Sequence, residues 1–323
     1  MAQLTYREAV AHALGKEMER DERVVLLGED LRAGGVFKTV RGLYEQFGGD
    51  RVRDTAISEQ AILGAAMGAA MNGLRPVAEI MFADFVGVCY DYLVNQIPKF
   101  RYMTGGQIEV PLVIRAHNGS GVRFGAQHSQ NIESWLMAIP GLKVVAPSTP
   151  ADVVGLLTAA IRDPDPVVFL EHKALLGTKG EVTDADFDDQ LGRAKVRRQG
   201  DDALIVTLGA MVPRALQAAD ALAQQGIECT VVDLRSLIPL DLATVTAEAA
   251  RVRRVFTLEE NPRPCGWGAE VSSLLVERAY DSLRAPITRI TMPYVPVPAS
   301  ATLEDAARPS VDRVVAEVQA AFR

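Results

Sequence analysis

Cysteine is scarce in this chain: its 323 residues include three cysteines, Cys89, Cys229 and Cys265. They are too few and too widely spaced to form a disulfide framework or a CxxC metal site. The first residues include Arg7, Glu8 and other charged side chains in place of an apolar core, so no signal peptide is visible. These features predict a protein of the reducing cytoplasm.

Long apolar runs and excess positive charge are also missing. No window approaches the ~20 apolar residues that a membrane-spanning helix needs. The net charge of -7 argues against general nucleic-acid binding. With 48% hydrophobic and 23% charged residues, the composition is that of an ordinary globular protein.

The common cofactor and catalytic motifs are absent. The sequence contains no Walker loop, no GxGxxG between a strand and a helix, no HExxH and no GxSxG. Without the glycine fingerprint that binds a dinucleotide pyrophosphate, a Rossmann oxidoreductase is disfavoured.

The pattern that is present alternates short apolar strands with helices. The chain is long enough for two domains. Strands that alternate with helices predict mostly parallel sheets with right-handed crossovers. We therefore expect two doubly wound α/β domains, at 1–178 and 201–323, joined by a polar linker at 179–200. The second domain is predicted to contain strands at 203–207, 228–233, 254–258 and 287–292, with helices at 213–225, 242–251 and 268–280.

The stretch 54–79 contains an acid in an unusual setting. Ser58 is a good N-cap for an apolar, small-residue helix that Gly73 ends, and Glu59 falls in its first turn. Gly64 and Gly68 lie on one helix face and predict close approach of another backbone. Glu59 either complements the helix dipole or is a buried acid directed at a protonated nitrogen of a ligand.

Other polar or aromatic residues follow predicted strands, where α/β proteins bind ligands. Glu29 follows the strand 24–27, and Phe85 belongs to an aromatic cluster that by composition is a core feature. His128 lies in a polar loop after the strand 111–115, where a histidine can titrate near neutral pH. A helix is expected at 87–100, with Asp91 in a structural role.

The sequence blocks LGED (27–30), DTAISE (54–59), RYMTGG (101–106), GAQHSQ (125–130) and GLKVV (141–145) occur in this order. Together they resemble the beta subunit of the thiamine-diphosphate-dependent E1 component of 2-oxo acid dehydrogenase complexes. The resemblance covers nearly the whole chain. It implies a transketolase-like pyrimidine-binding domain followed by a transketolase C-terminal-like domain.

The resemblance also implies roles for individual residues. Glu59 would bind the pyrimidine ring of thiamine diphosphate and favour its imino form, and Phe85 would flank that ring. Glu29 would touch the cofactor pocket, and His128 would handle protons or charge during reductive acylation of a lipoyl group. Related chains often carry a polar or aromatic residue at the position of Val88. This difference bears on the substrate pocket more than on the cofactor site.

The turn after the helix 151–162 resembles the structural potassium site of the family. The residues concerned are Ala160, Ile161, Asp163 and Asp165, whose oxygens suit a hard cation. Asp165 replaces the usual asparagine, and a plain prolyl turn is the other interpretation.

Enzymes of this superfamily bind the Mg²⁺ and diphosphate of the cofactor with a GDG sequence and a downstream asparagine. Gly49-Asp50-Arg51 and Gly200-Asp201-Asp202 do not fit that pattern. The resemblance therefore implies that an E1 alpha subunit supplies the Mg²⁺ site, in an α2β2 heterotetramer. It also implies that the second domain dimerises and holds the dihydrolipoamide acyltransferase core with its lipoyl domains, with Glu259, Glu260 and the region of Arg323 as candidate contacts.

The implied function is oxidative decarboxylation of pyruvate or a branched 2-oxo acid. The stretches FRYM (100–103), PLVIR (111–115) and EHK (171–173) favour an acetoin-cleaving relative as the alternative. A non-catalytic scaffold subunit is a third hypothesis, and the presence of Glu59 and His128 disfavours it.

Overall fold

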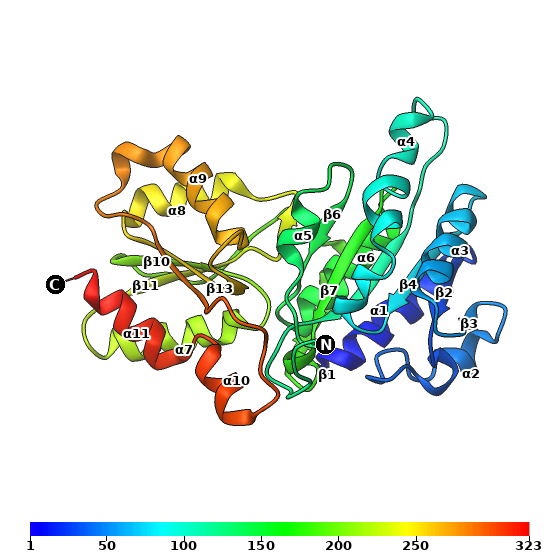
Figure 1. Cartoon of the computed structure of the whole chain (residues 1–323), viewed down its shortest axis with the longest axis horizontal. Coiled ribbons are helices and arrows are strands. Elements are labelled where there is room, and N and C mark those ends of the chain that lie inside the picture. The colour runs from blue at the N-terminus through cyan, green and yellow to red at the C-terminus, as the bar shows by residue number, and fades with distance from the viewer. Residues whose placement is uncertain (323) are drawn as a thin grey trace. The chain divides into compact units, whose positions relative to one another are not determined.

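The computed structural model describes residues 1–322. Its internal contacts separate two units: residues 1–118 with 135–191, and residues 119–134 with the chain from 192 onward. Each unit is built on mainly parallel strands and helices, as the alternating pattern predicts (Figure 1). Segment 119–134 lies within the predicted first domain, 1–178, but by its contacts it clusters with the second unit.

Six strands of the first unit form a parallel sheet in the order β6-β7-β5-β4-β2-β3. Most of their side chains are buried, as expected where helices and loops cover both faces of a parallel sheet. The strands are β2 (Val24–Gly28), β3 (Val52–Asp54), β4 (Arg75–Ile80), β5 (Val113–Asn118), β6 (Lys143–Val145) and β7 (Val167–His172).

Helix α1 (Tyr6–Arg20) begins at a capping box formed by Thr5 and Glu8. The Thr5 backbone N–H donates to Glu8 Oε2 at 2.8 Å, and the Glu8 backbone N–H donates to Thr5 Oγ1 at 3.3 Å. Its apolar stripe is buried, and the helix packs against α6 (Pro150–Arg162). The other helices in this part of the chain are α2 (Leu43–Phe47), α3 (Glu59–Met71), α4 (Phe100–Met103) and α5 (Glu133–Met137).

The helix predicted at 87–100 is not continuous. The chain forms a 3₁₀ helix at Ala83–Gly87, a π-helical turn at Tyr92–Gln96 and then α4. The Asp91 carboxylate accepts hydrogen bonds from Asn95 Nδ2 (2.7 Å) and Gln96 Nε2 (3.2 Å), which confirms its structural role. The Ile97 N–H donates to the Tyr92 carbonyl five residues back, which is the spacing of a π turn, and such turns often occur at functional sites.

The sheet of the second unit has the order β14-β13-β10-β11-β9, in which only β9 runs antiparallel to its neighbour. Its strands are β9 (Lys195–Arg198), β10 (Ala203–Thr207), β11 (Cys229–Asp233), β13 (Val255–Pro262) and β14 (Thr288–Met292), and β12 (Ser236–Ile238) follows β11 in the chain. The predicted strands at 203–207, 228–233, 254–258 and 287–292 agree with these bounds to within a few residues.

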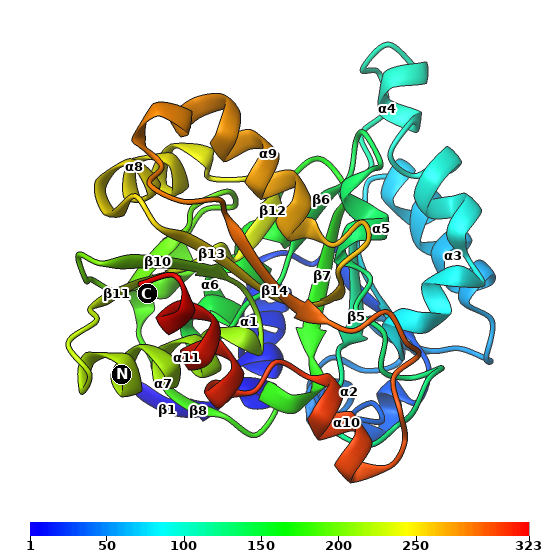
Figure 2. The same ribbon diagram turned by 60° about the vertical axis from the view of Figure 1, so that its left-hand side comes forward.

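Helices cover both faces of this second sheet. Helices α7 (Met211–Ala223) and α11 (Val311–Ala320) lie on one face, and α8 (Leu242–Val252) and α9 (Trp267–Ala279) lie on the other (Figures 1 and 2). Helix α10 (Ala301–Ala307) precedes α11. The predicted linker 179–200 contains β8 (Lys179–Val182), which pairs antiparallel with β1 (Ala2–Thr5), and β9.

Candidate active site

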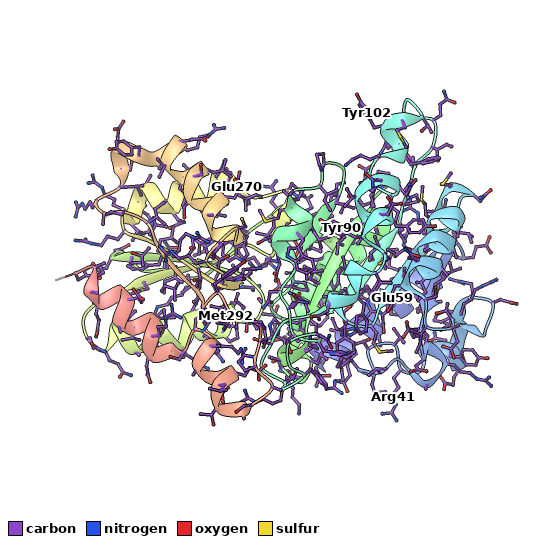
Figure 3. The ribbon with its side chains drawn as sticks, viewed as in Figure 1. Arg41, Glu59, Tyr90, Tyr102, Glu270 and Met292 are labelled. Atoms are coloured by element: carbon purple, nitrogen blue, oxygen red, sulfur yellow. The ribbon has the colours of Figure 1, made fainter. Side chains whose placement is uncertain are left out.

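Glu59 is the first residue of α3 and is 7% exposed (Figure 3). Ser58 occupies the N-cap position as predicted, but its side chain makes no capping hydrogen bond there. The start of the helix therefore lacks its usual side-chain cap, and the carboxylate of Glu59 occupies the electropositive end of the helix dipole.

Glu29 is a second buried acid beside Glu59. It directly follows β2 and is also 7% exposed. Burial raises the pKa of the Glu29 carboxyl, and the negative charge of Glu59 raises it further. Within residues 1–322, no hydrogen bond or ion pair joins either carboxylate to a protein group, so both remain available to a ligand.

Phe85 is connected to Glu59 through Cys89. Its 3₁₀ helix places its ring edge-to-face with Phe82, with ring centroids 5.5 Å apart. The buried Cys89 thiol donates to the carbonyl of Phe85 at 3.7 Å, and burial followed by the charge of Glu59 raises the pKa of this thiol to about 12. Cys89 thus links the Phe85 turn to Glu59. The sequence contains no signal of this contact, because an isolated cysteine among apolar residues resembles any core position.

A buried ionic cluster lies at the carboxyl ends of the neighbouring strands β4, β5 and β7. Arg115 donates to Glu171 through Nε (2.5 Å) and Nη2 (3.0 Å), to Glu79 through Nη1 (2.7 Å) and to Thr39 through Nη2 (3.0 Å). Burial alone would lower the pKa of Arg115, but the charges of Glu171 and Glu79 outweigh burial and raise it. Burial raises the pKa of Glu79, and Arg115 partly opposes that rise. The guanidinium is therefore held charged in the interior.

The sequence analysis missed this cluster, although a signal exists. Single charged residues interrupt the apolar strands PVAEI, LVIRA and VFLEH near their carboxyl ends. In the sheet, Glu79 is in register with Arg115, and His117 is in register with Glu171. Charged residues at matching positions of adjacent buried strands indicate pairing, because an isolated charge could not be buried there.

An aromatic path joins the cluster to Phe85. Phe37 packs on the His117 ring at 4.4 Å and meets Phe82 edge-on at 5.4 Å between centroids, and Phe82 in turn meets Phe85. Burial, followed by the charges of Arg115 and Lys173, lowers the pKa of His117 well below its ordinary value. This histidine is therefore neutral at physiological pH, and its ring packs against that of Phe37.

The two helical glycines do not play the predicted role. A Cβ at Gly64 would approach the Tyr92 hydroxyl to 2.6 Å, so a side chain of the π turn and not a second backbone excludes it. A Cβ at Gly68 would meet nothing within 4 Å. Between the start of α3 and the π turn lies a hollow of about 410 Å³ lined by Ser58, Gln60, Ala61, Asp91, Tyr92 and Gln96.

His128 lies in the irregular loop of the second unit and is half-buried. Its loop position agrees with the sequence prediction. The structure thus places Glu29 within the field of Glu59 and links Phe85 to Glu59 through Cys89, all in the first unit, and His128 belongs to the second.

The predicted potassium segment is filled by cationic groups of the protein itself. The Arg75 guanidinium donates through Nη1 to the carbonyl oxygens of Ile161 (2.8 Å) and Asp163 (3.2 Å). Lys143 Nζ bonds both carboxylate oxygens of Asp163 (2.6 and 2.7 Å), and Arg101 bonds Asp165 (2.6 Å). The Ala160 carbonyl accepts the Asp163 backbone N–H at 3.3 Å. Three positive side chains thus bond the carbonyls of Ile161 and Asp163 and the carboxylates of Asp163 and Asp165, an arrangement that disfavours a potassium ion there.

The interpretation of Glu259 and Glu260 as partner contacts is wrong. They are 1% and 7% exposed, and they bond Arg289 (3.0 Å) and Arg308 (2.7 Å) inside the second unit. Arg323 lies outside the described residues. Within residues 1–322, no cluster of three or more His, Cys, Asp or Glu side chains could hold a metal ion. None of the described helices combines the length and apolar character needed to cross a membrane.

Comparison with known proteins agrees with the expected architecture. Residues 2–179 match the family "Transketolase, pyrimidine binding domain", and residues 192–314 match "Transketolase, C-terminal domain". A solved split-gene transketolase, described as an inactive beta4 tetramer, is 26% identical with a TM-score of 0.79, over 98% of both chains. These matches confirm the predicted transketolase-like fold of two α/β domains.

Curated relatives agree along nearly the whole chain. The beta subunit of acetoin:2,6-dichlorophenolindophenol oxidoreductase from Cupriavidus necator is 46% identical over 97% of this chain and 96% of the relative. The pyruvate dehydrogenase E1 component subunit beta-2 of Oryza sativa is 44% identical over 97% and 85%. The 2-oxoisovalerate dehydrogenase subunit beta of Bacillus subtilis is 43% identical over 99% and 98%. The chain therefore belongs to the family of E1 beta subunits of pyruvate, acetoin and branched-chain 2-oxo acid dehydrogenases.

Proposed function

We propose that this chain is the beta subunit of a thiamine-diphosphate-dependent E1 enzyme that oxidatively decarboxylates a 2-oxo acid and transfers the acyl unit to a lipoyl group. The transketolase-like E1 family depends on thiamine diphosphate in general. We further propose specific roles for the site residues, an alpha subunit that completes the site, and a lipoyl group as the acyl acceptor.

The main support for the proposal is the buried, unpaired carboxylate of Glu59. It is buried at a helix N-terminus, in the field of a second acid, and no group within residues 1–322 bonds it. Burying a charge without a partner is unfavourable, so the site is complementary to a ligand that brings a donor N–H. The ring nitrogen of an aminopyrimidine is such a donor when it is protonated, so these residues fit thiamine diphosphate.

Each residue of the site would contribute separately. When bound, thiamine diphosphate supplies a nucleophilic carbon and an electron sink for loss of carbon dioxide. Glu59 would hold a proton on the pyrimidine nitrogen through a charge-assisted hydrogen bond, which is strong at low dielectric. Phe85 would provide an apolar wall, and Glu29 would hold a proton at higher pH than an exposed carboxyl does. His128 would move a proton during transfer to the lipoyl sulfur.

The companion polypeptide is part of the proposal. The chain carries the acid for the pyrimidine half but no GDG sequence for the Mg²⁺ and diphosphate half. An alpha subunit would supply that half in an α2β2 heterotetramer, and the second domain would hold the acyltransferase core. The description of the split-gene transketolase neighbour as an inactive beta4 tetramer supports the need for a companion chain.

Acetoin is the second candidate substrate. Beta subunits named for acetoin oxidation, from Cupriavidus necator and Bacillus subtilis, are 46% and 43% identical to this chain. The pyruvate and 2-oxoisovalerate relatives are similar to nearly the same degree, and pocket residues of the alpha subunit also select the substrate.

Co-expression with the alpha subunit, followed by assay with pyruvate, branched 2-oxo acids and acetoin, tests the proposal. We expect the two chains to co-purify and to reduce an artificial electron acceptor only when thiamine diphosphate, Mg²⁺ and one of these substrates are present. Tight binding of thiamine diphosphate and Mg²⁺ by the beta chain alone would refute the shared-site proposal.

A further inference from the structure

The loop that carries His128 is anchored at several points to helix α10 and to the end of β13, all within the second unit. We infer that Glu304 of α10 is a positioning residue that holds segment 119–134, here called the histidine loop, in the conformation in which His128 acts. This inference rests on the proposed role of His128 and extends it to a residue far away in the sequence.

The histidine loop has a backbone that would not hold its shape by local preference. Gly119, Gly121, Arg123 and Gly125 all have positive φ, at 87°, 96°, 69° and 74°. Arg123 is not a glycine, so its left-handed conformation is unfavourable by itself. Backbone conformations of this kind persist where surrounding contacts overdetermine them, and they cluster at functional sites.

Glu304 makes the central contact. It is fully buried, and its Oε1 accepts the backbone N–H of Gly121 at 2.6 Å. Its Oε2 accepts Arg123 Nη1 at 2.5 Å. One carboxylate therefore bonds both the main chain and a side chain of the histidine loop, and bonds to a charged acceptor are stronger than neutral ones.

Other groups of the same unit add to the clamp. Arg123 Nη2 bonds both carboxylate oxygens of Asp305, at 2.8 and 2.7 Å. Ser120 Oγ donates to Glu260 Oε1 at 2.9 Å, and Arg308 Nε donates to the same oxygen at 2.7 Å. A Cβ at Gly121 would overlap the Arg308 guanidinium, so this glycine allows the loop to approach α10 closely.

The other limb of the loop is held by the end of β13. Asn261 Nδ2 donates to the carbonyl of Asn131 (3.2 Å) and to Glu133 Oε2 (3.2 Å). Gly119 N–H donates to the carbonyl of Gln130 at 3.2 Å and closes the base of the loop. His128 lies between the two anchored limbs, and its N–H donates to the carbonyl of Gly125 at 3.4 Å. A backbone hydrogen bond therefore joins Gly125 to His128.

The test uses the assembled enzyme with its alpha subunit and compares Glu304→Gln, Arg123→Gln and Asp201→Asn. Glutamine keeps the size of Glu304 but not its charge. Arg123 is 37% exposed in its side chain, so its variant removes the clamp from the loop side without opening the core. Asp201 also pairs with an arginine, Arg251, but it is 89% exposed and makes no contact with the histidine loop, so it is the control.

Two quantities are measured for each variant. Hydrogen exchange of peptides covering 119–134 reports opening of the loop. The exchange rate should rise about tenfold in the Glu304 and Arg123 variants, because each loses about one charge-assisted hydrogen bond. Acylation of a free lipoyl domain should fall about tenfold, while reduction of an artificial dye falls much less. The Asp201 control should match the unmodified protein in both.

A double variant separates positioning from general damage. If Glu304 acts through His128, then Glu304→Gln combined with His128→Ala should acylate no more slowly than His128→Ala alone. Multiplicative losses in the double variant, or unchanged exchange in 119–134 on Glu304→Gln, would overturn the inference. Normal acylation by His128→Ala would refute the proposed role of His128 and with it the positioning role. If His128→Ala loses acylation but the Glu304 and Arg123 variants acylate normally, only the positioning role of Glu304 is refuted.

Discussion

Glu29 and Glu59 are buried acids close enough for the charge of one to act on the other, and neither forms an ion pair within residues 1–322. The charge of Glu59 adds to burial in raising the pKa of Glu29, and neither acid bonds a protein donor within residues 1–322. Such an arrangement is unfavourable for the protein alone. It is consistent with a site formed for binding, in which some stability is lost to function.

Replacing Glu29 with glutamine should stabilise the protein in a pH-dependent way. A carboxyl whose pKa is raised by folding stabilises the folded state while it is protonated. That contribution is fully present below the unfolded pKa and is lost as the pH rises through the folded pKa. Glu29→Gln stays neutral, so its thermal midpoint should exceed that of the unmodified protein at neutral pH and converge with it near about pH 4. Differential scanning calorimetry across this range measures the difference, with the exposed Glu22→Gln as control. A difference independent of pH would contradict the expectation.

Replacing Glu59 with glutamine should abolish most turnover while leaving the assembly intact. The variant cannot make the charge-assisted bond to the pyrimidine, and losing positioned acid-base assistance lowers rates by at least ~100-fold. Steady-state turnover of the purified heterotetramer measures this, and size-exclusion chromatography checks assembly. Near-normal activity would show that Glu59 serves only the helix dipole.

Removing Arg115 should destabilise the first unit strongly. Arg115→Met leaves Glu79 and Glu171 buried without their cation, and breaking a buried ion pair from one side costs about 3–5 kcal/mol. The matched surface variant is Arg23→Met, whose arginine pairs with Asp21 but is 55% exposed, and such pairs contribute about 1 kcal/mol or less. Urea unfolding of both variants compares the two losses. Similar urea midpoints for the two variants would indicate that the buried cluster does not stabilise the first unit.

Exchanging potassium for sodium should leave the thermal midpoint unchanged at constant ionic strength. Arg75, Lys143 and Arg101 already bond the oxygens of the segment 161–165, so no free oxygen cage is formed there. An ion that does not bind the folded state cannot stabilise it. A midpoint that rises selectively with potassium would show that the ion enters this segment in spite of the three cations.

The sequence predicted features that depend on near neighbours. The capping box at Thr5, the order of strands and helices and the position of Glu59 at a helix start all follow from local patterns. The continuous helix expected at 87–100 is instead a 3₁₀ helix, a π turn and a short α helix, and hydrophobic periodicity does not distinguish these helix types. Glu259 and Glu260 resembled surface acids because their partners, Arg289 and Arg308, lie outside their own strand.

By itself, the sequence determined the family of this protein, its α/β class and the acid at its candidate site, since helix starts and apolar strands are encoded by adjacent residues. Only the tertiary structure decided that Glu29 and Cys89 lie within the field of Glu59, and that Arg75 bonds the carbonyls of the potassium-like turn. Only the structure shows that the histidine loop is bonded to α10, through a hydrogen bond between Gly121 and Glu304, which are 183 positions apart. Contacts over such distances depend on how whole elements pack, and local sequence patterns do not specify that packing.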